Sequence, residues 1–245
     1  MFSQVKRSLA IAEKNMRIYY LKGPVVVSGI LFPMFLFLAF SVGRSIPIDF
    51  LISGLLSMTL FFTATSVSPV IAPWEGSMKT LERLVSAPVS LSAILLGDVV
   101  ASFAFGVAIS MVPLAFGLLI GISIINPLVL AASIIIAAFC FSSLGILLST
   151  PPTNVPSNVM MFSTLVKFPL IFISGIFIPL EQMPAWGKLV ALFSPLTYLT
   201  DLIQYSIQGI SYYPILLDVA LILAFTVLFL ILAVVIHKRN LAKRL

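Results

Sequence analysis

Charged side chains are scarce in this sequence. Asp, Glu, Lys and Arg make up 9% of the 245 residues, whereas hydrophobic residues reach 60% and the mean hydropathy is +1.19. An average soluble domain has roughly 25% charged residues. The apolar residues form long unbroken runs instead of alternating ten-residue strands, which favours helices over an outer-membrane barrel. We therefore expect an all-α, polytopic integral membrane protein.

Cysteine and histidine each occur once. Cys140 lies alone in an apolar run, so no disulfide framework or cysteine–histidine metal site is expected, and we predict a small buried side chain there. His237 stands beside Lys238 and Arg239 at the end of the last apolar run. Phosphate-binding, dinucleotide-binding and H-E-x-x-H zinc motifs do not occur. An enzyme active site, a cofactor and a metal are therefore not expected in this chain.

The apolar runs divide into six predicted membrane spans. About 20 residues cross a bilayer core of roughly 30 Å as a helix. The breaker clusters "GISIINP" (121–127) and "PPTNVP" (151–156) separate the central runs, which carry no charge between residues 99 and 166. The predicted spans of this single transmembrane domain, 1–245, are 23–43, 50–73, 91–120, 127–150, 158–180 and 214–236.

Basic residues predict the orientation. Lys and Arg gather at the two termini and after the second span, whereas the opposite loops carry only Arg44 and Lys188. The positive-inside rule then places both termini in the cytoplasm, and the net charge of +6 needs no nucleic-acid partner. Residues 1–22 form a basic amphipathic helix for the membrane interface, with an apolar face of Val5, Leu9, Ala12, Met16 and Tyr19. This helix is either a plain anchor or a part that transmits motion.

A few charged residues fall within predicted spans. Lys167 lies about ten residues into the fifth span, where a lysine costs about 2.5–3.5 kcal/mol on insertion scales, and Pro169 is expected to kink the helix. Asp98 lies at a similar depth in the third span, so an Asp98–Lys167 ion pair is one hypothesis. The alternative places Asp98 at the headgroup boundary, and Asp218 likewise.

The stretch "FISGIFIPLEQMPAWGKLVALFSPLTY" (172–198) interrupts an apolar run with glycine, proline and charged residues. Non-helical backbone at membrane depth is tolerated only where protein or a wet cavity covers it. We expect Gly175 and Pro179 to end the fifth span and residues 181–209 to form a re-entrant helical hairpin, with Trp186 and Tyr198 as interface anchors. The alternative is an amphipathic loop lying flat on the membrane.

A short segment after the second span, "PWEGSMKTLERLVSAPVS" (73–90), has a proline near each end. Its pattern predicts a short cytoplasmic helix over residues 75–89. This helix is either a rigid peg between two spans or a solvated loop helix.

These motifs resemble the type-2 ABC exporter permeases, a family of bacterial and archaeal subunits for drug, lipid and polysaccharide export. Residues 174–204 match its S-G-x-x-(F/P)…(L/M)-P-x-W…P-(L/F)-T-(Y/H)…(D/E) signature, and "TLERLVSAPVS" (80–90) matches its segment after the second span. The resemblance implies a dimeric permease of the cytoplasmic membrane that docks separate ATP-binding subunits, which carry ATP and magnesium. It also implies a pathway lined by spans one, two and five, and an amphiphilic cargo.

The resemblance assigns roles by position. Residues 75–89 would be the coupling helix, with Glu82 at the family's acidic position; its candidate residues are Glu75, Lys79, Leu81, Glu82, Arg83 and Leu84. The outer gate would comprise Ser174, Gly175, Pro179, Pro184, Trp186, Pro195, Thr197, Tyr198 and Asp201. The pathway or dimer seam would include Lys167, Pro169 and Asp98.

Two rival functions follow from other readings of the same residues. One is an ion-coupled secondary transporter that uses Lys167 and Asp98, although such a protein should place several acidic or histidine residues at the midplane. The other is a membrane scaffold, against which the interrupted fifth span argues.

Overall fold

The computed structural model describes residues 2–43, 47–80, 86 and 89–240, and this part of the chain is helical. The elements are α1 (Phe2–Asn15), the π-helix η1 (Met16–Tyr20), α2 (Gly23–Ser41), α3 (Ile48–Ala64), α4 (Ser68–Ser77), α6 (Leu91–Ile120), α7 (Pro127–Leu148), α8 (Pro156–Phe172), the 3₁₀ turn η2 (Leu180–Gln182), α9 (Ala185–Ala191), α10 (Pro195–Gln208) and α11 (Ile215–Asn240). The predicted all-helical class is confirmed.

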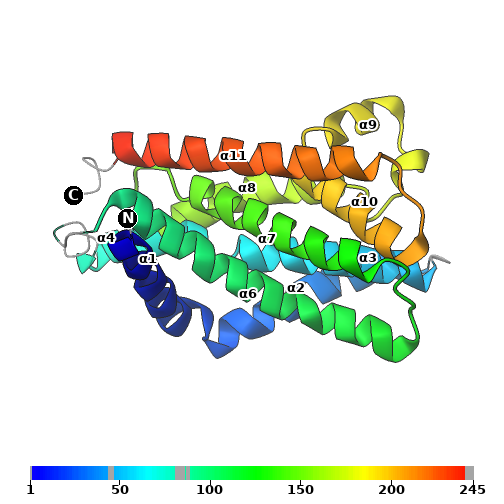
Figure 1. The fold of residues 1–245 in the computed structure, drawn as a ribbon, viewed down its shortest axis with the longest axis horizontal. Helices are drawn as coiled ribbons and strands as arrows, with labels where there is room; N and C mark the ends of the chain where they lie inside the picture. The colour runs from blue at the N-terminus through cyan, green and yellow to red at the C-terminus, as the bar shows by residue number, and fades with distance from the viewer. Residues whose placement is uncertain (1, 44–46, 81–85, 87–88, 241–245) are drawn as a thin grey trace.

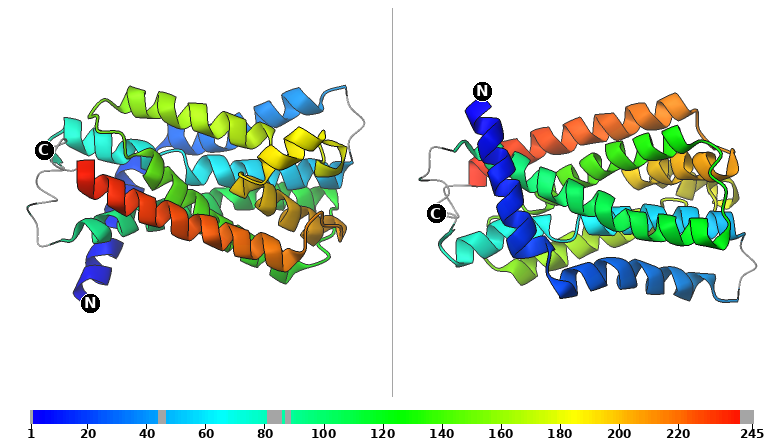
Figure 2. Two further views of the ribbon diagram at one scale, coloured as in Figure 1. Left: turned by 90° about the horizontal axis from the view of Figure 1, so that it is seen from above. Right: turned by 60° about the horizontal axis from the view of Figure 1, so that its bottom comes forward.

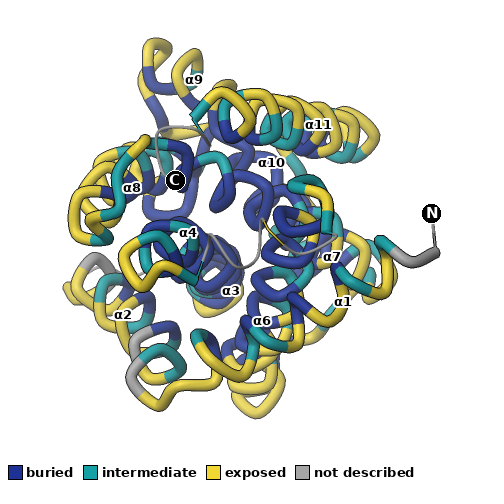
Figure 3. The backbone as a smooth tube through the Cα atoms, turned by 90° about the vertical axis from the view of Figure 1, so that its left-hand side faces the viewer, coloured by how far each residue is buried: buried dark blue, intermediate teal, exposed yellow. Residues whose placement is uncertain are grey.

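The long helices run side by side as one bundle, with α3 in the middle (Figures 1 and 3). The last described helix, α11, ends at the same end of the bundle as α1 and α4, and we call this the terminal end. The opposite end carries α9, which projects from the bundle, and the turn after α10; we call it the hairpin end. The main core joins apolar side chains of α3, α7 and α10, so α3 is covered on several sides.

Four helical stretches of the described residues are long and apolar enough to cross a membrane: Ile48–Ser77, Leu91–Ile120, Pro127–Leu148 and Ile215–Asn240. A fifth candidate joins the N-terminal helix to α2 across a bend of 87°. The predicted fifth span, 158–180, is shorter in the structure, because α8 has 17 residues and ends at Phe172. The chain turns there through Gly175, whose φ is +83°.

The second predicted span is broken, which the sequence analysis did not anticipate. Helix α3 ends at Ala64, and α4 begins at Ser68. Pro69 explains the break, since it lacks the N–H that would bond to the carbonyl of Thr65 four residues earlier, and its ring clashes with that carbonyl. We call residues 65–67 the first break, and residues 173–179 after α8 the second break.

The N-terminal helix lies across the bundle at the terminal end (Figure 2) and packs against α6. Its buried face holds Ser8, Ile11 and Asn15. Ile11 contacts α6 at Gly97, where the Cβ of any other residue would collide with Ile11. The interface helix stays a prediction: of its apolar residues, Ala12 is buried against the bundle, whereas Val5 and Leu9 are exposed, as a face toward lipid would be.

Polar side chains inside the bundle are mostly hydroxyls that bond to their own helix. Ser57 donates to the carbonyl of Ser53 at 2.8 Å, and Thr63 donates to that of Thr59 at 2.6 Å. Such bonds satisfy the hydroxyl without a partner helix, so serine and threonine can be buried at membrane depth at little cost. Cys140 is buried as predicted.

Candidate functional site

The second break is stabilised by hydroxyl groups from its own neighbourhood. Ser174 is fully buried, and its Oγ donates to the carbonyl of Ile171 at 2.7 Å. Gly175 follows with a positive φ that favours glycine. The free carbonyls at the end of α8 are thus partly paired, and the chain turns away toward Pro179 and η2.

Helices α9 and α10 form a hairpin with a turn at Leu192–Ser194. Pro184 caps α9, and Pro195 is the first residue of α10, where its missing N–H costs nothing. Ser194 Oγ donates to the carbonyl of Leu170 at 3.3 Å, so the turn lies beside the last part of α8. Helix α10 is buried against α3, α7 and α11, whereas α9 is largely exposed.

Two residues of α10 hold the hairpin closed. Thr197 Oγ1 donates to the carbonyl of Ala191 at 2.9 Å, and the hydroxyl of Tyr198 donates to that of Leu192 at 2.7 Å. Both side chains thereby pair carbonyls at the end of α9. The expected interface anchor at Tyr198 is wrong, because Tyr198 is buried among Tyr213 and Phe225, with ring centroids at 5.9 and 6.3 Å. Trp186 is 69% exposed, and the interface role expected of it stays a prediction.

Asp201 anchors the loop that follows α10 through two backbone hydrogen bonds. Its Oδ1 accepts the backbone N–H of Tyr212 at 2.8 Å, and its Oδ2 accepts that of Tyr213 at 2.7 Å. Partial burial raises the pKa of Tyr213, with smaller contributions from Tyr212 and the nearby carboxylates. Asp218 is fully buried next to Asp201, and its expected position at the headgroup boundary stays a prediction.

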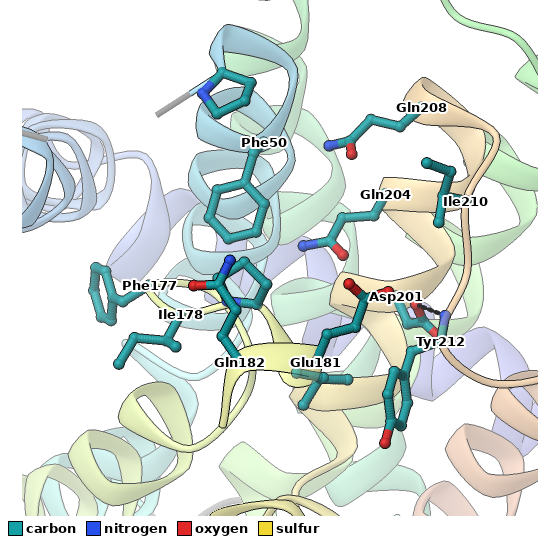
Figure 4. Close-up of a pocket in the computed structure, with 13 residues that line it drawn as sticks. Phe50, Phe177, Ile178, Glu181, Gln182, Asp201, Gln204, Gln208, Ile210 and Tyr212 are labelled. Atoms are coloured by element: carbon teal, nitrogen blue, oxygen red, sulfur yellow. Dashed lines mark hydrogen bonds between the residues drawn. The ribbon is translucent and has the colours of Figure 1, made fainter. Parts of the chain in front are cut away.

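A cavity of about 450 Å³ lies at the hairpin end (Figure 4). Its walls come from α3, the second break, η2, α10 and the following loop: Pro47, Phe50, Phe177, Ile178, Pro179, Leu180, Glu181, Gln182, Asp201, Gln204, Gln208, Ile210 and Tyr212. Figure 4 shows the amides of Gln204 and Gln208 pointing from α10 toward the side of Phe50. The second break therefore borders a pocket lined by both polar and apolar side chains.

Two cavity residues were missed in the sequence analysis. Gln204 and Gln208 follow Asp201 at positions i+3 and i+7, and this spacing puts the three polar side chains on one face of α10. That polar stripe within a buried helix is the signal that could have identified them. Of these three residues, the resemblance named only Asp201 as part of the outer gate.

Lys167 and Asp98 do not meet. Lys167 Nζ donates to the backbone carbonyl of Thr65 at 3.0 Å, at the first break. Asp98 is buried and accepts a hydrogen bond from the amide of Asn15 on α1. The proposed ion pair is therefore wrong, and the headgroup position for Asp98 stays a prediction. A backbone carbonyl satisfies the lysine, which sequence spacing could not reveal.

A cluster of polar and aromatic side chains at the terminal end joins α1 and η1 to α4. Lys14 on α1 forms an ion pair with Glu75 on α4, and the rings of Tyr19 and Trp74 stack with centroids 5.6 Å apart. Glu75 is 3% exposed, so it faces α1 and does not present the exposed surface expected of a coupling residue. This cluster ties the N-terminal helix to the helix that leads into residues 75–89.

Only part of the predicted coupling segment is described. Lys79 is exposed and adopts a positive φ of 55°, which ends the helical path of α4. Leu81, Glu82, Arg83 and Leu84 lie outside the described residues.

One surface of the bundle combines α2, α3 and α8. Phe32, Phe62 and Phe168 come from these three helices and contact one another, with ring centroids 4.9 to 6.4 Å apart. Pro169 lies inside α8 next to this group, and the predicted kink there stays a prediction. Large apolar residues are exposed along α2 and α8: Val27, Leu31, Phe32, Phe35, Leu38, Met160, Met161, Phe162, Leu165 and Phe172.

Comparison with known proteins points to one family over most of the chain. The family described as "ABC-2 type transporter" matches residues 6–208. Inner membrane transport permease YadH of Escherichia coli (strain K12) is 23% identical over 184 residues, which cover 74% of this chain and 71% of that protein. Nodulation protein J of Rhizobium leguminosarum bv. trifolii is 27% identical over 162 residues, which cover 63% of this chain and 60% of that protein.

Proposed function

This chain belongs to the ABC-2 type transporter family, and from that premise we propose that it is the permease subunit of an ATP-driven exporter for an amphiphilic or lipid-like molecule. Permeases of this family work with separate subunits that bind the nucleotide. The further parts of the proposal concern the membrane, the topology, the gate and the dimer.

The proposed location is the cytoplasmic membrane, in line with the printed name of the YadH relative. We propose six spans, with α2, α3–α4, α6, α7, α8 and α11 crossing once each and both termini in the cytoplasm. Supporting this orientation, the terminal end carries the basic residues Lys14, Lys22 and Lys238. Residues 75–89 then face the ATP-binding subunit, and the hairpin end faces outward.

The observation that carries the proposal is the second break with its hairpin. The backbone leaves helical geometry at Ile173, and the hydroxyls of Ser174 and Ser194 donate to the carbonyls of Ile171 and Leu170 at the end of α8. Thr197 and Tyr198 hold the two arms of the hairpin together. A cavity with polar and apolar walls lies directly against the second break. Helix α10 is packed into the bundle, but α9 is largely exposed, and the hydroxyl of Ser194 joins the hairpin turn to α8. The arm of the hairpin that includes α9 and borders the cavity can therefore move without unfolding a long helix, which suits an outer gate.

The proposed dimer seam is the aromatic surface of α2, α3 and α8. Exposed apolar faces of this size are ordinary in a lipid environment, but the ring contacts at Phe32, Phe62 and Phe168 join the three helices into one continuous patch. A second copy of the permease packed on this patch would enclose a pathway lined by methionine, phenylalanine, serine and threonine. Such a lining accepts amphiphilic cargo.

The test is to reverse the charge at Glu82. We expect Glu82→Lys to reach the membrane at the normal level but to lose its ATP-binding subunit, because it reverses the charge at the acidic position of the segment that we propose docks on that subunit. The measurement is co-purification of that subunit with the detergent-solubilised permease, followed by ATP hydrolysis in the eluate. Glu13→Lys is the matched control, since Glu13 is an exposed acidic residue of α1 whose side chain is 64% accessible. Full co-purification with Glu82→Lys would contradict the coupling role.

A further inference from the structure

The carbonyl of Thr65 stands at the first break without a helical partner. In a continuous helix it would accept the N–H of residue 69, but that residue is Pro69. The break is enclosed: Ala64 packs against Gly106 of α6, and Ser68 packs against Gly145 of α7, where an added Cβ would overlap Ser68 Oγ. Water has little access, because Thr65 is fully buried. An unpaired carbonyl here would be costly.

Lys167 pairs this carbonyl from another helix. Its Nζ lies 3.0 Å from the oxygen of Thr65, and the residue is 8% exposed. The last carbonyls of α3 also carry the partial negative charge of a helix C-terminus, which favours a cation at that place. Both effects explain how the bundle keeps a lysine at membrane depth on a backbone carbonyl.

The Lys167–Thr65 hydrogen bond lies between α4 and α8, the two helices that would move in the proposed transporter. Helix α4 leads from the first break to the predicted coupling segment and packs along α8. At the far end of α4, Gly76 meets Asn154 in the loop before α8 so closely that an added Cβ would collide with it. Helix α8 in turn leads into the second break and the hairpin.

We propose that Lys167 is a positioning residue for transport: by holding the carbonyl that Pro69 leaves free at Thr65, it keeps the second span broken and joins α4 to α8. A displacement of α4 by the ATP-binding subunit then passes to α8 and to the gate at Gly175. This inference rests on the proposed function for its mechanical part and on the contacts at the first break for the bond itself.

The bond is tested first, in the solubilised permease without any partner. Lys167→Met keeps the length of the side chain but removes its donors, and we expect its Tm to fall by roughly 3–8 °C. Lys167→Met combined with Pro69→Ala should recover most of that loss, because the alanine supplies a backbone N–H that can bond to the carbonyl of Thr65. Pro73→Ala is the matched control: it also removes a proline from α4, but it supplies no donor to Thr65, so it should not rescue Lys167→Met.

The positioning role is tested in the complex with the ATP-binding subunit. Gln204→Cys in a Cys140→Ala background reports the cavity, through its rate of reaction with a membrane-impermeant maleimide, with and without ATP. We expect ATP to change this rate by roughly fivefold or more when Lys167 is present. The change should be lost in Lys167→Met with Pro69→Ala, although that variant is stable, and Lys167→Arg should retain most of it.

The possible outcomes decide separately on the Lys167–Thr65 hydrogen bond and on the positioning role of Lys167. An unchanged Tm for Lys167→Met, or equal rescue by Pro73→Ala, would overturn the hydrogen bond. Recovery of both Tm and the ATP effect in the variant with Pro69→Ala would overturn the positioning role and leave a purely structural lysine. If ATP has no effect even with Lys167 present, the proposed function and the positioning role both fail, while the Tm comparison still decides the bond.

Discussion

The two breaks in this bundle are stabilised in different ways. At the first break, one carbonyl is paired by Lys167, a charged residue 102 positions away in the chain. At the second break, carbonyls at the end of α8 are paired by neutral hydroxyls, those of Ser174 three residues later and of Ser194 in the adjacent hairpin. The first break is also surrounded by α6, α7 and α8, whereas the second borders a cavity. We infer that the first transmits movement and the second is where the chain can open.

The largest expected effect comes from filling the first break. Gly145→Ala would place a Cβ against Ser68 Oγ and 3.3 Å from both Ser68 Cβ and the carbonyl of Ala64, so the buried hydroxyl of Ser68 must rotate and α7 must give way by a few tenths of an ångström. We expect the free energy of unfolding to fall by about 3 kcal/mol. Thermal unfolding of the solubilised permease measures it. Gly23→Ala is the control, because no atom lies within 4 Å of its added Cβ. Equal stability of the two variants would show that the first break is not tightly packed.

A smaller effect is expected at the second break. Gly175→Ala forces a Cβ into a φ of +83° and to 3.1 Å from Leu180 Cγ, which can move. Strain of about 1–2 kcal/mol should therefore dominate the loss of stability. Gly187→Ala in α9 is the control, since it lies in a helix and its added Cβ makes only ordinary contacts of 3.5 Å or more. If Gly175→Ala costs as much as Gly145→Ala, the difference proposed between the two breaks does not hold.

Local chemistry made the second break predictable. Gly175, Pro179, Pro184 and Pro195 each restrict the backbone by themselves, so the sequence indicated where the helix ends and where the hairpin turns. The third and fourth spans were also located closely, because turn clusters bound them and α6 matches 91–120. The partners of buried polar groups were not predictable in this way. Hydrogen bonds from Asn15 to Asp98 and from Lys167 to Thr65 join residues far apart in sequence.

The first break shows most clearly what could not be predicted from the sequence. Pro69 was visible in the sequence, but a 24-residue apolar run from 50 to 73 reads as one span when only its length is considered. The proline could have been weighed more heavily, since it removes a backbone bond wherever it stands. The face of α1 that packs on α6 was missed for a related reason. Small residues, including Gly97, decided the contact, and a count of apolar residues does not detect close approach.

The most direct test concerns the depth of the hairpin in the membrane. Ser194 bonds to Leu170 near the end of α8, so the account places the neighbouring Phe193 among lipid tails and Ile210, after α10, in water. Single spin labels at Phe193→Cys and Ile210→Cys, in a Cys140→Ala background in lipid vesicles, can be compared by their collisions with oxygen and with a water-soluble nickel reagent. The account predicts that oxygen dominates at 193 and nickel at 210. Equal access of nickel to both positions would mean that the hairpin lies on the membrane surface, and the proposed gate would be contradicted.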